Sequence, residues 1–497
     1  YFRNGLDDAD ERSLRMGLSW RPSATVHWLF TGDYSHNTPK GSSDNLVAAG
    51  IPGNGLPVPP LRDNSALYGS ADRAGKNQEF WGAALEYEQD LGFATFTLQG
   101  SHRNVSQRDR VYGAQNLTNP TEFGHSTTAE LRLTSPSGGA LEYVGGLYFF
   151  RESKYGGTGA FASQASDDLP FQIQILGQAT DAAAAFGQVT YSPSEALHLT
   201  LGARYNYDHK RSSSLVRAPP ALQFYEPPEA DHWNHVTYKA SLGYDVSPWN
   251  MLFASIATGY KSGTFAFGPT PRVDPQDVFA VEVGSKNRFF DDRLQVNLNA
   301  YYTDYKSLEQ AYTTPIAGTT LFMVAVTNTD GALMRGVDLD ADWAATARDR
   351  FRARVNYLNA RYRAFDLRPL GGLDYSGRQM ANTTPWALNV GYTRTWRGLG
   401  GSLDLSIDAQ YRAARGVSAT GNYDRSGEPY EQPAYTLLDV GLRYAPAGRR
   451  WRLSAYANNL FDEVHYAQAN YNVQRGYNVY AQLAPPRTVG LVLGVDF

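Results

Sequence analysis

Residues 487–497 read RTVGLVLGVDF, and this stretch decides the fold. Every second residue from Val489 to Phe497 is apolar, and the residues between them are mostly small or polar. Successive side chains of an extended strand point to opposite faces. The stretch therefore predicts a strand with one apolar and one mostly polar face, which ends the chain on an aromatic residue.

The same alternation recurs along the whole chain, at residues 94–103, 197–209, 294–303, 401–413 and 450–459. Leu199 and Leu405 lie on apolar faces, whereas Arg204 and Asp404 lie on the opposite faces of the same segments. So many apolar faces cannot share one soluble core, but a membrane barrel turns them toward lipid and its polar faces toward a wet lumen. Unpaired backbone groups are costly in lipid. We therefore expect an all-β, closed, antiparallel transmembrane barrel, with its lumen lined by Arg204, Arg352, Arg354, Asp404, Asp408, Arg412 and Arg452.

Composition agrees with a strand-built membrane protein. Hydrophobic residues make up 42% of the chain and the mean hydropathy is -0.44. A membrane-spanning helix needs about 20 consecutive apolar residues, and no such run occurs. The chain has no cysteine, which excludes a disulfide scaffold or a thiolate metal site, and its net charge of -4 gives no case for nucleic-acid binding. It contains no nucleophile-elbow or HExxH signature, and we predict neither an enzyme nor a cofactor.

Short and long connections alternate along the sequence. Short turns are predicted at 21–24, 90–92, 136–139, 193–195, 247–250, 290–292, 346–349, 398–400 and 446–449. Long polar loops are predicted at 37–76, 109–125, 153–182, 210–234, 261–275, 310–319, 366–383, 414–434 and 462–485. Membrane barrels place short turns at the periplasmic side and long loops outside. An interfacial aromatic girdle on the short-turn side would consist of Trp20, Trp249, Trp343, Trp396 and Trp451.

The strand count predicts how much of a barrel is present. Reading 320–345 as one long strand gives about 19 to 20 strands, and the last must run toward the periplasm. An even-numbered barrel then needs further strands before the first, which gives a total of about 22. The sequence begins Tyr1-Phe2-Arg3, without a starting Met or signal peptide. We expect residues 1–497 to be one barrel domain of a longer exported protein whose first strands lie upstream.

Several short motifs stand in a characteristic order. ATGYKSG at 257–263 is followed by a strand with an E-x-G-x-K pattern at 282–286, then by Asn328 with RGVD at 335–338, and by NNLFD at 458–462. Together with the carboxy-terminal strand, they resemble the barrel of TonB-dependent outer-membrane receptors, although Asp338 replaces the usual Glu. The matching positions are Gly259, Lys261, Glu282, Lys286, Asn328, Gly336, Asn458, Asn459, Phe461, Asp462, Arg487 and Phe497.

The resemblance implies a location and an activity. Such receptors lie in the bacterial outer membrane and import scarce ligands, most often ferric siderophores and otherwise cobalamin, haem or glycans. An N-terminal plug carrying a TonB box links them to the TonB complex, and neither is present in this sequence. The implied partners also include a small-molecule metal chelate, outer-membrane lipid or lipopolysaccharide, and the barrel-assembly machinery that reads the last strand. The lumen arginines would meet charges of the plug, or equally would pair along the barrel wall.

A different class of function stays open at this point. A passive porin-like channel or a barrel enzyme would have the same alternating strands. Plug-like sequence upstream would favour the importer, whereas a barrel of about 16 or 18 strands would favour a porin.

The candidate ligand contacts lie in the last long loop, 462–485, which is rich in Tyr, Asn and Gln. Aromatic rings and amides could grip a siderophore or sugar, although they also suit any extracellular loop. The candidates are Tyr471, Tyr477, Tyr480, Trp233 and above all Arg475, because an anionic chelate favours a cation.

Three other segments are weighed as binding motifs. His232 and His235 have a spacing that could hold a metal, but they have no fixed third ligand, and a metal-free surface loop is favoured. The acidic run at 7–11 lacks the pattern of a calcium loop, and the glycines at 50–55 do not form a phosphate cradle.

Overall fold

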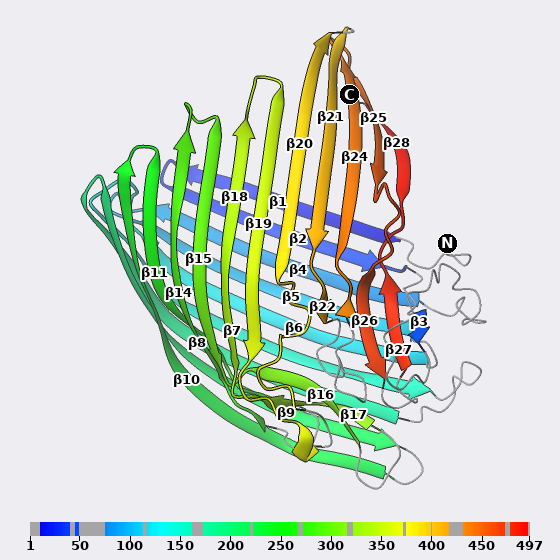
Figure 1. The fold of residues 1–497 in the computed structure, drawn as a ribbon. Coiled ribbons are helices and arrows are strands. Elements are labelled where there is room, and N and C mark those ends of the chain that lie inside the picture. The colour runs from blue at the N-terminus through cyan, green and yellow to red at the C-terminus, as the bar shows by residue number, and fades with distance from the viewer. Residues whose placement is uncertain are drawn as a thin grey trace.

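One antiparallel sheet of 19 strands forms the body of the molecule (Figure 1). The computed structural model describes residues 10–39, 45–48, 75–112, 117–161, 172–218, 222–266, 272–315, 322–370, 374–398, 400–416, 431–472 and 478–495. The count of about 19 strands in this chain is confirmed, and each strand pairs with the next sheet strand along the sequence.

The first part of the sheet consists of β1 (Glu11–Ser23), β2 (Val26–Asn37), β4 (Gly75–Asp90), β5 (Thr95–Tyr112), β6 (Leu117–Thr134), β7 (Leu141–Phe161), β8 (Gln172–Ser194), β9 (Leu197–Ala218) and β10 (Leu222–Ser247). The second part consists of β11 (Asn250–Lys261), β14 (Gln276–Phe289), β15 (Leu294–Lys306), β18 (Ala332–Ala344), β19 (Asp349–Tyr362), β20 (Trp386–Gly398), β21 (Gly401–Arg412), β24 (Tyr435–Pro446), β25 (Trp451–Asn458) and β28 (Thr488–Val495).

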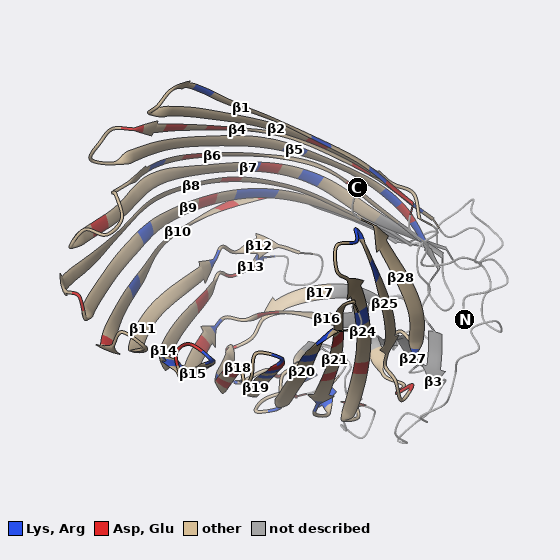
Figure 2. Cartoon of the chain, turned by 90° about the horizontal axis from the view of Figure 1, so that it is seen from above, with Lys and Arg blue, Asp and Glu red and all other residues tan. Residues whose placement is uncertain are grey.

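Short elements lie in the long connections between the sheet strands, at the rim opposite the short turns. They are β3 (Asn45–Ala48), β12 (Thr264–Phe265), β13 (Arg272–Val273), β16 (Glu309–Pro315), β17 (Phe322–Asn328), a 3-10 turn η2 (Arg368–Leu370), β22 (Arg415–Gly416), β23 (Glu431–Gln432), β26 (Tyr466–Asn472) and β27 (Asn478–Leu483). Figure 2 shows the sheet curving around an open interior, with β12, β13, β16 and β17 inside the curve. Among the described residues, no helix is long and apolar enough to cross a membrane.

The predicted short turns are confirmed as links between adjacent sheet strands. Local chemistry explains the turns. Phe290, Asp291 and Asp292 all adopt positive φ between β14 and β15, and the Asp90 carboxylate accepts a hydrogen bond from the amide of Gly92 at 2.7 Å. Short turns gather at one rim, and the longer connections with their small strands gather at the other (Figure 1).

The prediction of long loops at 109–125, 153–182 and 210–234 is wrong in extent. Strands continue through most of these segments: β8 is 23 residues long and β10 is 26. These segments have polar residues on both faces, a pattern that favours loops. However, a pair of strands that extends beyond the lipid has water on both sides, so its sequence no longer alternates between apolar and polar residues although the strands stay paired. The β9–β10 ladder runs up to Ala218 and Leu222, with a register shift between Glu226 and Glu229 where two prolines interrupt it.

Reading 320–345 as one strand is also wrong. β17 pairs only with β16 in a separate hairpin, and β18 begins at Ala332 in the main sheet. The break falls at Gly331, whose φ of 115° is a conformation that other residues rarely adopt.

The apolar faces lie on the convex side of the sheet. Leu199 and Leu491 are 39% and 75% exposed, and Leu405 on the same face is half-buried. On the opposite face, Trp233 of β10 contacts Phe265 of β12, with ring centroids 6.2 Å apart, and β12 lies inside the curve (Figure 2). The prediction that the apolar faces point outward is therefore confirmed for these strands.

Large rings of the inner wall lie over glycines of the neighbouring strand. Phe253 faces Gly284, Tyr301 faces Gly336 and Tyr456 faces Gly490; Phe186 likewise lies beside Gly146. A Cβ on Gly284 would lie 2.6 Å from the Phe253 ring, so no larger residue fits without moving the ring. The absence of a side chain at each glycine thus leaves the space that the neighbouring ring occupies.

Candidate functional site

Two hairpins lie inside the barrel mouth, β12–β13 and β16–β17 (Figure 2). Asn328 at the end of β17 ties them to the wall. Its amide nitrogen donates to the carbonyls of Asp274 at 3.0 Å and Ser307 at 2.9 Å, and its oxygen accepts from the Asp274 amide at 2.7 Å. The family-motif position Asn328 is therefore a staple between three chain segments.

A small apolar core anchors the β16–β17 hairpin. It consists of Tyr312, Ala325, Tyr362, Phe365, Leu367 and Tyr375, with Leu308 and Met380 packed against it. The Tyr362 hydroxyl donates to the Gln310 side chain at 2.9 Å. Residues 366–383, predicted as a long loop, contribute η2 and part of this core. The mouth is therefore lined by packed structure on this side.

Trp233 lies on the inner face of β10, where it is only 7% exposed. The chain segment at Gly263 and Phe265 covers its ring so closely that a Cβ on Gly263 would lie 2.6 Å from it. The Lys210 ammonium lies 6.0 Å from the ring centroid, within reach of a cation–π interaction. The indole nitrogen is buried without a described hydrogen-bond partner. Trp233 thus supports the β12–β13 hairpin and presents one unused donor.

A group of charges surrounds Lys210 above this tryptophan. The ammonium of Lys261 binds Glu309, and Gln276 donates to the same carboxylate at 3.1 Å. Lys210 follows Tyr207, an exposed ring near the outer end of the lipid-facing part of β9, so it lies past that part. Burial lowers the pKa of Lys210, the carboxylate of Asp208 opposes this shift, and the positive charge of Lys261 adds to it. An anionic ligand would relieve this cost.

The seam between β10 and β11 opens beside these charges. Its ladder ends at the pair Lys239 and Ala257, and above it the rings of His235 and Tyr260 stack with centroids 4.5 Å apart. The His235 ring nitrogen lies 3.3 Å from the Asp277 carboxylate. Burial, followed by the charge of Asp208, raises the pKa of the Tyr260 hydroxyl, which keeps it a neutral donor.

The hypothesis of a histidine metal site gains nothing from the structure. His232 and His235 lie in the long strand β10, so the favoured surface-loop interpretation is wrong about the backbone. Their side chains point to opposite faces, because His232 contacts Tyr207 of the convex face and His235 contacts Tyr260. Within the described ranges, no group of three His, Cys, Asp or Glu could hold a metal ion.

The residues predicted to line the lumen lie on the concave side, and several pair along the wall. Arg352 bridges to Asp408 at 3.4 Å across Gly391, and Arg354 binds Asp340 at 2.7 Å. The remaining contacts are these: Asp404 accepts from Thr395, Arg412 donates to Asn389, Arg452 lies over Gly494, and Arg204 donates to Asn206 between the rings of Tyr148 and Phe186.

The structure describes the backbone at two of the four predicted ligand contacts in 462–485. Arg475 and Tyr477 lie outside the described residues, as do the segments 7–9 and 50–55 and the terminal Phe497. Tyr471 and Tyr480 lie on the paired strands β26 and β27. No sequence pattern points to Lys210, Tyr260 or Glu309, because they meet from strands far apart in the chain.

The NNLFD motif forms the turn that follows β25. Asn459 is buried with a φ of 49°, and its side chain exchanges two hydrogen bonds with the backbone of Glu463, at 2.8 and 2.9 Å. The Asp462 carboxylate accepts from the Arg487 amide at 3.0 Å, which positions the start of β28. Asn458 ends β25, and Phe461 is exposed. The motif is a structural staple for the last strand.

The other motif positions also have wall or mouth contacts. Gly259 lies against Val278, and the Lys286 ammonium lies 5.7 Å from the centroid of the Phe253 ring. Glu282 borders the same hollow as Lys286 on the inner face of β14.

His465, just past this turn, has a half-buried imidazole. Its ring stacks on Tyr435 with centroids 4.5 Å apart, and burial lowers the pKa of the imidazole from 6.5. The folded chain then binds this proton at a lower pH than the unfolded chain does. The contribution of the neutral ring to the free energy of unfolding is therefore fully present above pH 6.5, and it is lost as the pH falls through the pKa of the folded state.

We expect acidification to about pH 5 to lower the protection factors of amides in 431–466, measured by mass spectrometry and corrected for the intrinsic pH dependence of exchange. The variant His465→Phe keeps a ring but has no proton to bind, and its corrected protection factors should be equal at both pH values. Equal acid sensitivity in the wild type and the variant would contradict this role.

Comparison with known proteins places this architecture. The family model described as "TonB dependent receptor-like, beta-barrel" matches residues 2–460. The chain belongs to this family of TonB-dependent receptor barrels. It is an outer-membrane β-barrel protein, and the family is one of transporters and not of enzymes. The rim with short turns is accordingly the periplasmic rim, and the mouth with its inner hairpins faces outward.

Individual relatives are distant. The pesticin receptor of Yersinia pestis is 24% identical over 338 residues, which cover 66% of this chain and 46% of the relative. The chain thus spans about half the length of the curated relatives it matches. The structure of the ferric yersiniabactin uptake receptor from Yersinia pestis superposes with a TM-score of 0.78 at 15% identity, covering 99% of this chain and 71% of that one. The ferric-catecholate import receptor of E. coli gives a TM-score of 0.72 at 15% identity, with coverages of 99% and 76%.

Proposed function

We propose that this barrel is the transport domain of a longer receptor that imports a ferric siderophore across the outer membrane, with energy delivered through TonB. Residues 1–497 form one domain in this proposal, completed to about 22 strands and a plug by upstream sequence. Membership of the receptor family supports the proposal, and relatives whose names specify ferric yersiniabactin and ferric catecholates support the ligand class.

The observation that carries the proposal is the half-buried ammonium of Lys210, which lies over the Trp233 ring at the outer mouth. It lies against Trp233 and near Lys261, inside a wall stiffened by two packed hairpins. A pocket that combines an aromatic surface, a cation and a few directed donors suits a compact anionic chelate. The sequence-predicted contacts Arg475, Tyr471, Tyr477 and Tyr480 are part of this proposal, and the strands β26 and β27, which carry Tyr471 and Tyr480, lie at this rim (Figure 1).

The test is the affinity of the full-length receptor for a panel of ferric siderophores. Lys210→Gln removes a positive charge that an anionic ligand would contact in a site from which water is largely excluded. We therefore expect the affinity for the recognised chelate to fall by about tenfold to a hundredfold. Lys239→Gln is the matched control, because Lys239 lies on the same face of the wall nearer the periplasmic rim, and it should bind normally.

Uptake of labelled iron by iron-starved cells completes the test. Uptake that requires TonB and fails in a receptor deletion supports import. Uptake of unselected small solutes without TonB would replace the proposal with a passive channel. Equal affinity of Lys210→Gln and wild type for every chelate in the panel would remove the proposed site.

A further inference from the structure

Three consecutive turns of the periplasmic rim carry four exposed arginines, which we call the basic arc. Arg348 lies in the β18–β19 turn, Arg397 lies at the end of β20, and Arg449 and Arg450 lie in the β24–β25 turn. After Lys306 the chain contains arginines but no lysine. The cations of this rim are therefore all guanidinium groups.

Backbone hydrogen bonds hold the three turns in one continuous edge. The Thr395 amide donates to the carbonyl of Arg348 at 2.8 Å, and the Ala447 amide donates to the carbonyl of Gly400 at 2.7 Å. Neighbouring strands of a sheet lie about 4.8 Å apart, so successive turns are about 10 Å apart and the basic arc spans about 20 Å. The arginines thus have fixed starting points along the rim.

The carboxylates closest to the basic arc along the chain already have partners. Asp342 accepts two hydrogen bonds from Arg350, both at 2.7 Å, and Asp349 binds Arg394 at 2.9 Å. Asp404 accepts from the Thr395 hydroxyl at 2.7 Å. Within the described part of this rim, no carboxylate pairs with an arginine of the basic arc, so its positive charge is available to a partner.

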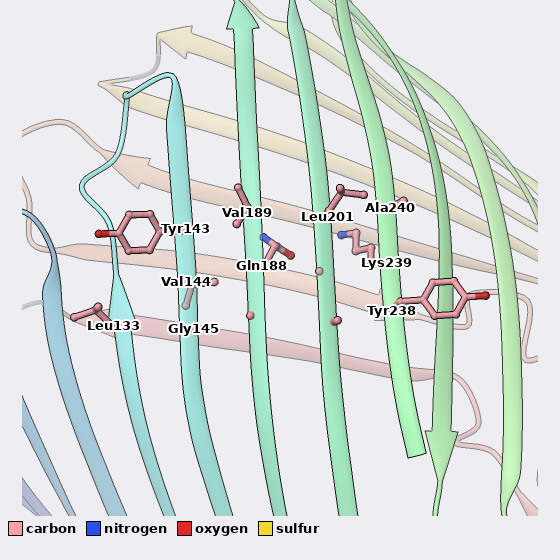
Figure 3. A pocket seen from close by; sticks show the side chains of 13 residues that line it. Leu133, Tyr143, Val144, Gly145, Gln188, Val189, Leu201, Tyr238, Lys239 and Ala240 are labelled. Atoms are coloured by element: carbon pink, nitrogen blue, oxygen red, sulfur yellow. The ribbon is translucent and has the colours of Figure 1, made fainter. Parts of the chain in front are cut away.

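The other side of the periplasmic rim has a different character. The turns that follow β4, β6, β8 and β10 contain no Lys or Arg, and one of them exposes Glu195. The lipid-facing wall beside these turns is apolar, and leucine, valine and tyrosine side chains border a hollow of about 680 Å³ in it (Figure 3). The uncompensated positive charge is therefore concentrated on the side from β18 to β25.

Phospholipid does not account for the basic arc. Trp396 and Trp451 are 37% and 38% exposed on the lipid-facing side, where such rings mark the membrane interface. Arg397 follows Trp396 and Arg450 precedes Trp451, so the alternation of a strand turns both arginines to the opposite face. Lipid also surrounds a barrel on every side, whereas the basic arc covers only one. The geometry fits a partner in the periplasm.

The chemistry of arginine narrows the kind of partner. Guanidinium groups bind carboxylates with paired, charge-assisted hydrogen bonds. One exposed pair contributes little affinity, so four of them become useful only on a body that offers several carboxylates at once. Peptidoglycan, the polymer beneath the outer membrane, carries free carboxylates on the peptides of its repeating units.

We propose that the basic arc docks this receptor on peptidoglycan, with its guanidinium groups on carboxylates of the peptide stems. The docking surface lies at the rim opposite the mouth, so it is separate from the ligand site and does not depend on which ligand is imported. It gives the barrel one side that faces the cell wall.

The experiment measures the fraction of full-length receptor, purified in detergent, that sediments with isolated peptidoglycan sacculi. The variant Arg348→Gln/Arg397→Gln/Arg449→Gln/Arg450→Gln removes the basic arc and leaves the turns intact. Its dissociation constant should rise by about tenfold to thirtyfold, because four charged contacts are lost.

A control variant removes the same number of charges from the outer half of the molecule. It is Arg151→Gln/Arg211→Gln/Arg272→Gln/Arg368→Gln, whose arginine side chains are between 56% and 64% exposed. It should sediment like the wild type. Sacculi whose carboxylates have been amidated should bind the wild type as weakly as native sacculi bind the variant without the basic arc.

Nanodiscs separate the cell wall from the lipid. Receptor in phosphatidylcholine and in phosphatidylglycerol nanodiscs should sediment with sacculi equally. Loss of sedimentation in phosphatidylglycerol would assign the basic arc to anionic headgroups and overturn the proposal. Equal sedimentation of the wild type and the variant without the basic arc, or undiminished binding to amidated sacculi, would overturn it as well. A failure of siderophore import would leave these results unchanged.

Discussion

Asn328→Leu is expected to release both inner hairpins from the barrel wall. The substitution keeps a side chain of similar size but removes three hydrogen bonds, two to carbonyls and one from the Asp274 amide. At about 1 kcal/mol each, their loss costs roughly 3 kcal/mol of local stability. Amide exchange in β16 and β17 should therefore accelerate by about a hundredfold or more, and siderophore affinity should fall with it.

A matched asparagine separates this local effect from general destabilisation. Asn287 also donates two side-chain hydrogen bonds, to Ser285 and to the Val296 carbonyl, but it lies near the periplasmic end of β14. Asn287→Leu should lower the stability of the barrel while leaving exchange in β16 and β17 unchanged. If Asn328→Leu left those hairpins as protected as in the wild type, the staple would have no energetic role.

Gly331→Ala is expected to be the most damaging single-methyl change in the mouth. Gly331 has a φ of 115°, and a Cβ there would overlap the carbonyl oxygen of Tyr305, which is fixed in the β15–β18 ladder. Backbone atoms cannot yield as a flexible side chain can, so the start of β18 must move. We expect a loss of more than about 4 kcal/mol, measured by urea unfolding of the barrel in detergent.

Gly377→Ala provides the control for backbone conformation alone. Its φ of 71° is also positive, but no atom lies within 4 Å of the position that a Cβ would take. It should cost only about 1–2 kcal/mol, the usual penalty for a left-handed conformation. Equal effects of the two substitutions would show that the overlap with Tyr305 is relieved without cost.

Sequence patterns predicted the parts of this fold that depend on single strands. Alternation placed Leu199 and Arg204 on opposite faces because the period of a strand is the same wherever it lies. Strand ends were missed where the chain leaves the lipid, since β8 to β10 stay paired there without an apolar face. The β16–β17 hairpin was missed because no local pattern distinguishes a strand of the wall from a strand folded inside it.

The candidate site was less predictable for a different reason. Lys210, Lys261 and Glu309 are separated by tens of residues and meet only because two sheet strands and one hairpin converge at the mouth. Arg475 was chosen from loop composition and lies outside the described residues. The motif residues were recognised, but the sequence did not show that Asn328 and Asn459 act by hydrogen bonds to the backbone.

The glycines that lie beneath large rings of the inner wall have a mechanical consequence. The rings of Phe253, Tyr301 and Tyr456 lie against glycines, so they protrude less into the bore than they would beside larger residues. A domain held inside the barrel therefore does not interlock with protruding apolar side chains at these rings. Such a domain can shift along the barrel axis by exchanging polar contacts alone, so these rings add little resistance to its movement.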